Sequence, residues 1–172
     1  MNRMTIPFET DRLLLRTMQA DDLDAVYEIW GSPEVMKYCG GASTKSQIQR
    51  SIKFYRRLQN EKGYSVYTVL LKENSSIIGV CGFNPAENEH EAELLYHFNQ
   101  LCWGKGYAAE ATAACVAALR KNGPNVRKII AAVDPANPAS GKVLRKIGMT
   151  AAGMKWFEDT QQEELCYEME LA

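Results

Sequence analysis

Apolar side chains recur with two different periods along the chain, and the changes of period mark the expected helices and strands. Residues 20–30 and 44–63 carry apolar side chains three and four positions apart, which predicts two amphipathic helices. Thr44 and Gln47 match a capping box at the start of the second helix. Residues 12–16 form a short apolar run between two arginines and predict a buried strand before these helices.

After residue 63 the pattern is mainly that of strands. Six segments are predicted to be strands: residues 64–71, 77–83, 92–98, 128–133, 154–158 and 163–171. Residues 107–119 and 140–147 return to helical spacing. The resulting order, β-α-α-β-β-β-α-β-α-β-β, predicts an α/β or α+β fold on a mixed sheet. Because no repeat or linker composition divides the sequence, we expect a single domain over residues 1–172.

Composition and charge exclude several classes of function. The chain has 172 residues and a formal net charge of -1, so it has no basic field that would draw it to nucleic acid. Its N-terminus lacks the apolar stretch of a signal peptide, and no run reaches the length of a membrane span, which predicts a cytoplasmic protein with no membrane partner. Its five cysteines are scattered and its histidines number two, so neither a disulfide framework nor a metal site is expected.

The most informative motif is the Trp-Gly-Lys-Gly-Tyr-Ala sequence of residues 103–108. It lies between the predicted strand that ends near Phe98 and the predicted helix that begins at Tyr107. Gly104 and Gly106 leave the backbone open to close approach, and the helix that follows directs its free N–H groups and the positive end of its dipole to the same place. The motif therefore predicts a site for the phosphate groups of a ligand.

A dinucleotide is one phosphate-bearing ligand that this motif could bind. Gly104, Gly106 and Ala109 have the spacing of the dinucleotide fingerprint, and Asp134 follows the next predicted strand. In that fingerprint, however, the first glycine follows its strand almost directly, whereas residues 99–103 intervene here. A dinucleotide-binding oxidoreductase is kept only as a distant alternative.

Three motifs in order resemble the GNAT superfamily of acetyl-CoA-dependent N-acetyltransferases, and more closely its RimJ/RimL-like branch of ribosomal-protein acetyltransferases. Residues 9–16, followed by the acidic pair at 21–22, resemble the first strand and helix of that branch. Residues 103–108 resemble its pyrophosphate loop, in which this branch also has tryptophan first. Residues 137–149 resemble its Asn-x-x-Ser helix, with Met149 where the family has phenylalanine. The resemblance covers essentially the whole chain.

This resemblance implies a mixed, mostly antiparallel central sheet flanked by about four helices. The fourth strand, residues 92–98, carries a bulge in this family and splays from the fifth, residues 128–133, and the pantetheine arm of acetyl-CoA lies in the gap. The resemblance implies the following cofactor-binding residues: His97, Phe98 and Asn99 through their backbone, Trp103, Gly104, Lys105, Gly106, Tyr107 and Ala108 in the pyrophosphate loop, and Asn137 and Ser140 on the short helix.

The implied reaction is transfer of an acetyl group from acetyl-CoA to a primary amine, by direct attack in a ternary complex and without a metal. Many members of the superfamily use a tyrosine seven residues after the asparagine as the acid, but this chain has Leu144 there. By resemblance, Ser140 is then the residue that interacts with the thiol. Glu93 is the candidate base, with His97 and water as the other options, and the alternative for Glu93 is a pairing role.

The acceptor is not defined by the sequence. In this family the loop over residues 31–44, the second helix and the closing hairpin shape the acceptor pocket, so Tyr38, Tyr64, Trp156 and Phe157 are expected to line it. Both a protein N-terminus and a small-molecule amine remain open as acceptors, and a homodimer remains open as the assembly. Because the usual tyrosine is missing, a non-catalytic acyl-CoA-binding sensor is the alternative function.

Overall fold

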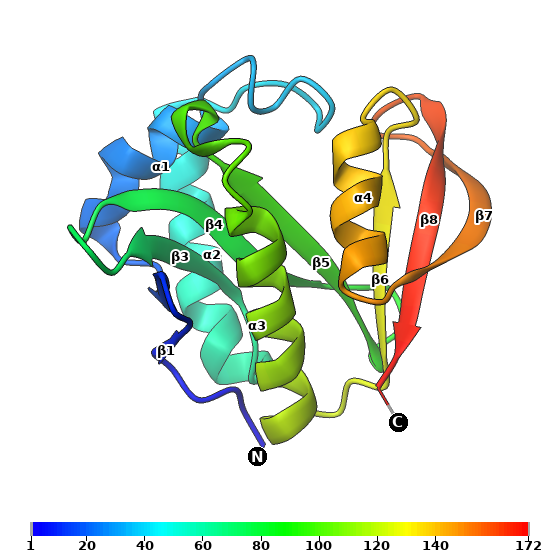
Figure 1. Ribbon diagram of the computed structural model, residues 1–172, viewed down its shortest axis with the longest axis horizontal. Helices are drawn as coiled ribbons and strands as arrows, with labels where there is room; N and C mark the ends of the chain where they lie inside the picture. Colours follow the sequence, from blue (N-terminus) through cyan, green and yellow to red (C-terminus); the bar gives the residue numbers. More distant parts are fainter. Residues whose placement is uncertain (1, 172) are drawn as a thin grey trace.

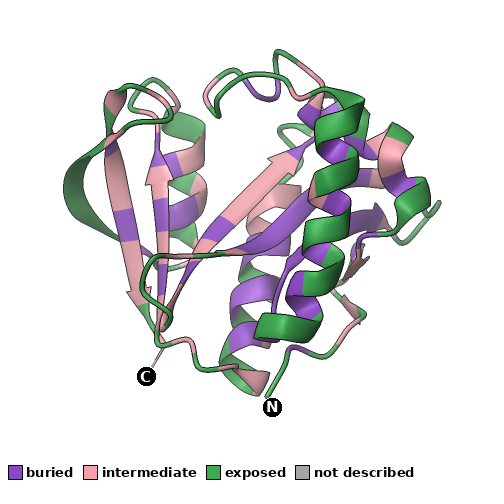
Figure 2. Cartoon of the chain, turned by 180° about the vertical axis from the view of Figure 1, so that it is seen from behind, coloured by how far each residue is buried: buried purple, intermediate pink, exposed green. Residues whose placement is uncertain are grey.

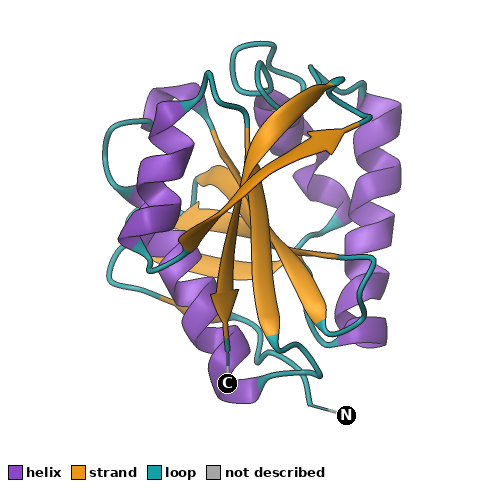
Figure 3. Cartoon of the chain, turned by 90° about the vertical axis from the view of Figure 1, so that its right-hand side faces the viewer, coloured by secondary structure: helices purple, strands orange, loops and turns teal. Residues whose placement is uncertain are grey.

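A computed structural model describes residues 2–171, and it is built on one eight-stranded sheet with helices on both sides (Figures 1 and 3). The strands are β1 (Phe8–Glu9), β2 (Leu13–Thr17), β3 (Val66–Leu71), β4 (Ile77–Pro85), β5 (Glu91–Phe98), β6 (Lys128–Val133), β7 (Thr150–Phe157) and β8 (Gln162–Glu170). The helices are α1 (Leu23–Trp30), α2 (Lys45–Lys62), α3 (Tyr107–Asn122) and α4 (Pro138–Lys146). Short 3-10 turns at Ala20–Asp22 and Gln100–Cys102 complete the set.

The sheet has the order β1-β2-β3-β4-β5-β6-β8-β7, and only its β5–β6 pair is parallel. The predicted fold class, a mostly antiparallel mixed sheet with four helices, is therefore confirmed. In Figure 1, α3 and α4 lie in front of the sheet and α1 and α2 lie behind it. The buried core follows the middle strands (Figure 2), and the largest fully buried side chains include Tyr67, Phe83 and Leu15.

Local sequence signals define the ends of α2. The Thr44 Oγ1 accepts a hydrogen bond from Gln47 N at 3.2 Å, and the Gln47 Oε1 accepts one from Thr44 N at 2.8 Å. These two contacts form the predicted capping box, which satisfies two backbone groups at the helix start. Gly63 ends the helix with a φ of 80°, a left-handed conformation that glycine adopts without steric cost.

Two predicted elements differ from the observed ones, and one observed strand was not predicted. The helix predicted over residues 20–30 begins with a 3-10 turn, because the Asp22 carboxylate folds back onto Gln19 N and the Arg16 guanidinium. β7 begins at Thr150, four residues before the predicted strand, and it is exposed along nearly its whole length at the sheet edge. β1 has two residues and was not predicted.

Candidate active site

The parallel pair β5–β6 opens into a gap. Pairing between these strands is confined to Glu91–Glu93 of β5 and Lys128–Ile130 of β6, and beyond it the strands diverge (Figure 1). The splayed gap between the fourth and fifth predicted strands is therefore present. The implied bulge is absent: β5 pairs with β4 in one continuous register from Phe98 to Ala92, so the expectation of a bulge in this strand was wrong.

The hydrogen-bond pattern of β5 decides which of its backbone groups face the gap. Asn99 N donates to Ile78 O of β4 at 2.8 Å. Because bonded pairs alternate along an antiparallel ladder, the backbone of His97, two residues earlier, also points toward β4. The backbone groups of Tyr96 and Phe98 point the other way, into the gap. Of the three residues predicted to hold a ligand through their backbone, Phe98 alone faces the gap in this way.

The loop after β5 has the geometry of an anion site. Gly104 and Gly106 adopt left-handed φ values of 77° and 81°, and an added Cβ on Gly104 would meet no atom within 4 Å. Within residues 2–171, the amide N–H groups of Gly104, Lys105 and Gly106 donate to no backbone carbonyl. They are continuous with the free N–H groups of the first turn of α3, which begins at Tyr107. The loop thus presents a row of donors at the positive end of a sixteen-residue helix.

Arg12, which immediately precedes β2, holds this loop from outside. Its Nη1 donates to Lys105 O at 2.9 Å, and its guanidinium lies 4.4 Å from the centre of the Tyr107 ring. Its Nε and Nη2 both bind Glu110 Oε1 at 2.7 Å. Burial raises the pKa of Glu110, but hydrogen bonds from Thr10 and Arg12 outweigh it, and the pKa lies below its ordinary value. Glu110 is therefore ionised at neutral pH, and its contacts with Arg12 fix the guanidinium against the loop.

Trp103 fixes the other end of the loop. Its indole Nε1 donates to Phe98 O at 2.9 Å, across the 3-10 turn that joins β5 to the loop. The indole is about half exposed, at 49%. This contact ties the start of the glycine loop to the last residue of β5, so the tryptophan fixes the position of the loop.

The N-terminal end of α4 lies on the other side of the gap. Asn137 occupies the N-cap position, but its side chain makes no capping hydrogen bond and lines a cavity in the gap instead. Ser140 lines the same cavity, and its Oγ lies 2.6 Å from the Tyr96 Oη of β5. Leu144 is 1% exposed and faces the core. The loop and this helix end therefore bracket the gap with backbone donors at one point and polar side chains at another.

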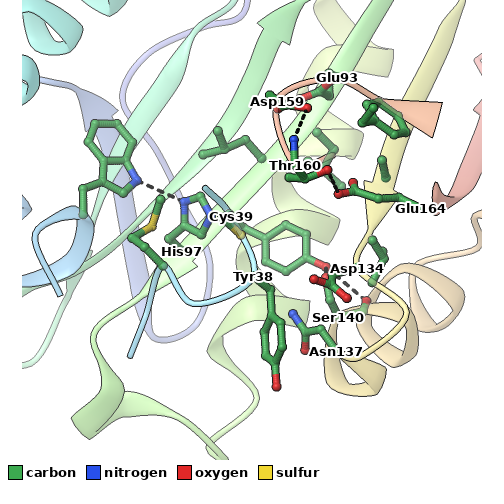
Figure 4. A pocket seen from close by; sticks show the side chains of 18 of the residues that line it. Tyr38, Cys39, Glu93, His97, Asp134, Asn137, Ser140, Asp159, Thr160 and Glu164 are labelled. Carbon is green, nitrogen blue, oxygen red and sulfur yellow. Dashed lines mark hydrogen bonds between the residues drawn. The ribbon is translucent and has the colours of Figure 1, made fainter. Parts of the chain in front are cut away.

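The cavity between these elements has a volume of about 390 Å³ and is strongly acidic (Figure 4). Four carboxylate side chains line it: Glu93, Asp134, Asp159 and Glu164. Among its lining residues, all in the described part of the chain, there is no lysine or arginine. Figure 4 shows Glu93, Asp159 and Glu164 on one side of the cavity and Asn137 and Ser140 on the other. The cavity is therefore a place where a cation is stabilised.

The surroundings of Glu93 in the cavity alter its protonation. Burial raises its pKa, and the negative charges of Asp159 and Glu164 raise it further. Glu164 is itself 7% exposed and accepts a hydrogen bond from Thr160 Oγ1 at 2.8 Å. A carboxylate with a raised pKa is a stronger base than one with an ordinary pKa, which suits Glu93 to accept a proton.

His97 has a different role from Glu93. Its Nδ1 accepts a hydrogen bond from Trp30 Nε1 at 3.0 Å, and since an indole N–H can only donate, the imidazole proton is on Nε2. Burial lowers the pKa of His97 to about 4, so the ring is neutral at neutral pH. A neutral ring with a protonated Nε2 is a donor toward the cavity, and this favours Glu93 over His97 as the base.

Two of the four predicted acceptor-pocket residues line the cavity, and two do not. Tyr38 and Phe157 are part of its wall. Tyr64 is 3% exposed and packs edge-on against Phe83 in the core, and Trp156 is half exposed with its Nε1 bonded to Glu158. The prediction was wrong for these two for different reasons. Side chains alternate along β7, so Trp156 lies on the face opposite to that of Phe157. Tyr64 precedes β3, and its ring is buried in the core.

Sequence reasoning missed several residues of the site. Tyr96, Trp30, Asp159 and Glu164 line the cavity, and Arg12 holds the glycine loop. The alternation of β5 was a usable signal for Tyr96, since it lies between two residues of the opposite face.

Over residues 2–171 no group of three His, Cys, Asp or Glu side chains is arranged to hold a metal ion. None of the helices in that range combines the length and apolarity needed to cross a membrane.

Known proteins share this architecture. The family model described as the acetyltransferase (GNAT) domain matches residues 12–150. The chain belongs to the GNAT acetyltransferase family. It is 32% identical over 148 residues to the uncharacterized N-acetyltransferase p20 of Bacillus licheniformis, covering 84% of this chain and 83% of that one. Acetyl transfer is thus the activity class of this chain.

Solved structures agree with the family assignment. The GNAT-family acetyltransferase of Bacillus anthracis is 27% identical and superposes with a TM-score of 0.85, over 96% of this chain and 99% of that one. RimL, a ribosomal alpha-N-protein acetyltransferase solved in complex with coenzyme A, superposes with a TM-score of 0.74 at 15% identity, over 94% and 95% of the two chains. At that identity, the RimL structure shows a shared fold alone.

Proposed function

We propose that this chain is an acetyl-CoA-dependent N-acetyltransferase that acts on a cationic primary amine, by direct attack within a ternary complex in one domain spanning residues 1–172. The observation that carries the proposal is the continuity of the β5–β6 gap: free backbone N–H groups lie beside one part of it, and a cavity lined by four carboxylates lies beside another. The gap thus offers one place for a phosphate-bearing donor and one for an amine.

Acetyl-CoA fits the residues along the gap as a substrate. The N–H groups of residues 104–108 would bind its pyrophosphate, in the manner of other helix N-termini. The backbone of Tyr96 and Phe98 would bind its pantetheine arm, with Asn137 facing the same arm from α4. Trp103 and Lys105 would act by shaping the loop, through the contacts with Phe98 O and Arg12. His97 would contribute through its ring, since its backbone points toward β4.

The reaction needs a neutral amine, a polarised thioester carbonyl and a stabilised leaving thiolate. In this proposal Glu93 accepts the proton of the attacking amine, directly or through water. The N–H groups of β5 that face the gap polarise the carbonyl oxygen, as an oxyanion hole does. Ser140 donates a hydrogen bond to the departing sulfur. Each group acts on a different atom of the same tetrahedral intermediate.

The acidic lining favours cationic acceptors over neutral or acidic ones. Four carboxylates around one cavity attract a protonated amine and repel an acceptor that carries its own carboxylate. Small polyamines, amino sugars and basic protein N-termini share this chemistry. The dinucleotide oxidoreductase loses its basis, since the family model covers the glycine loop as part of an acetyltransferase domain. A cytoplasmic location and a homodimeric assembly stay predictions.

A steady-state assay of thiol release tests this proposal. With acetyl-CoA present, the expected result is thiol release with small diamines and basic peptides, and little release with amino acids or acidic peptides. Ellman-type detection of the free thiol supplies the measurement. If acetyl-CoA raises the thermal stability of the protein but no amine releases thiol, the sensor alternative replaces this proposal.

Arg12 provides a further prediction about the donor site. Arg12→Ala should raise the KM for acetyl-CoA about fivefold with kcat little changed, because a half-exposed ion pair and one hydrogen bond to the loop contribute about 1 kcal/mol together. Steady-state kinetics with varied acetyl-CoA make the measurement. Arg50→Ala is the matched control, since Arg50 is an exposed arginine on α2 whose side chain, among residues 2–171, forms a hydrogen bond only with Ser46. Equal KM values for the two variants would contradict this role for Arg12.

A further inference from the structure

Two hydroxyl groups from different elements meet at the wall of the gap. Tyr96 Oη of β5 lies 2.6 Å from Ser140 Oγ and 3.1 Å from Ser140 O, both at the start of α4. Both residues line the cavity. A phenol that touches two oxygens of one serine controls where that serine's proton points. This contact joins residues that are 44 positions apart in the sequence.

The same helix lacks the tyrosine that many relatives of this fold use as an acid. Leu144, at that position, is buried against the core and offers no hydroxyl. Tyr96 brings a phenol to the start of the same helix from the opposite wall of the gap. Because even-numbered residues of β5 face α3 and α4, its side chain reaches Ser140 without disturbing the ladder.

We propose that Tyr96 is a positioning residue that orients the Ser140 hydroxyl toward the leaving sulfur of acetyl-CoA. Tyr96 has one proton and two acceptors on Ser140, the carbonyl and the hydroxyl oxygen. When negative charge develops on the sulfur, the Ser140 proton turns to the sulfur and the Tyr96 proton turns to Ser140 Oγ. A short chain of two hydrogen bonds then ends on the thiolate.

The bonds and charges of this step balance without a further reagent. The amine first gives its extra proton to the solvent and attacks in its neutral form. The C–N bond then forms from the amine lone pair, and Glu93 takes the proton that the nitrogen loses after the bond has formed. The C–S bond breaks and its electron pair goes to the sulfur. The sulfur leaves as a thiolate that accepts a hydrogen bond from the Ser140 hydroxyl, and it gains a proton from water afterwards. Burial raises the pKa of Tyr96 to about 12, so the phenol keeps its proton at neutral pH and remains a donor throughout.

The inference rests on the proposed acetyl transfer, and the test separates the two. Wild-type protein, Tyr96→Phe, Ser140→Ala and the double variant are compared by steady-state kinetics with acetyl-CoA and an amine that the wild type accepts. Tyr167→Phe is the matched control, because it removes another buried tyrosine hydroxyl that contacts α4, through Arg145, outside the cavity wall. Thermal unfolding of each variant reports on folding.

Tyr96→Phe should lower kcat about tenfold, the effect of one hydrogen bond to a charge, while the KM for acetyl-CoA changes less than about twofold. Tyr167→Phe should leave kcat near that of the wild type. The double variant should be no slower than Ser140→Ala alone, because Tyr96 acts only through Ser140. An unchanged kcat in Tyr96→Phe, or a further tenfold loss in the double variant, would overturn the inference. Inactive wild-type protein would instead contradict the proposed function.

Discussion

Glu93→Gln should lower kcat about 100-fold while leaving acetyl-CoA binding intact, because loss of a positioned general base removes at least that factor. Glutamine preserves the size and hydrogen-bonding shape of the side chain and removes its basicity. The Glu93 side chain makes no hydrogen bond to another described residue, so the substitution leaves no partner unsatisfied. The measurement is kcat at saturating amine and acetyl-CoA across a range of pH.

The dependence of kcat on pH should show the direction in which the pKa of Glu93 is shifted. Since the pKa of Glu93 is raised, kcat should fall on the acidic side at a higher pH than an ordinary glutamate would give. Asp159→Asn is the matched control: it keeps the base but removes a negative charge that raises that pKa. It should retain most of kcat and move the acidic limb to lower pH. If Glu93→Gln keeps wild-type kcat, Glu93 is not the base.

Gly104→Ala should weaken acetyl-CoA binding about 30-fold, the cost of losing charge-assisted hydrogen bonds worth about 2 kcal/mol to the pyrophosphate. A methyl group at this position has free space in the protein itself, yet it would occupy the path of the phosphates to the backbone N–H groups. The dissociation constant is measured by calorimetric titration with acetyl-CoA.

Gly153→Ala separates this effect from backbone strain. Gly153, in β7, also has a positive φ, 99°, and free space around an added Cβ, but it lies outside the loop. Both alanine variants should lose about 1–2 kcal/mol of folding stability through the left-handed backbone. Only Gly104→Ala should lose affinity for acetyl-CoA. Similar affinities in the two variants would show that the glycine loop does not bind the pyrophosphate.

Most helices and strands of this fold can be predicted from the sequence, because the signals that define them come from residues close together in the chain. The capping box of Thr44 and Gln47 and the left-handed Gly63 depend on residues within one or two turns. The glycine loop was predictable for the same reason, since Gly104 and Gly106 adjoin the helix that they introduce. β1 was missed because two residues cannot display a period.

The site itself depends on contacts between distant residues. Arg12 meets Glu110 across 98 positions, and Trp30 meets His97 across 67. No periodicity specifies such a pair, because each follows from how the elements pack around the sheet. The sequence predicted Glu93 and Ser140 as candidate catalytic residues. The structure adds the groups that act on or contact them: Asp159 and Glu164, whose charges act on the first, and Tyr96 beside the second.

Transfer of a labelled acetyl group tests the central claim most directly. The protein is incubated with acetyl-CoA carrying an isotopic label in its acetyl group and with a small diamine, and the products are separated and weighed by mass spectrometry. The account predicts the label in an amide of the diamine, with an equal amount of free coenzyme A. Label that remains in acetyl-CoA, or that appears only as acetate, would contradict it.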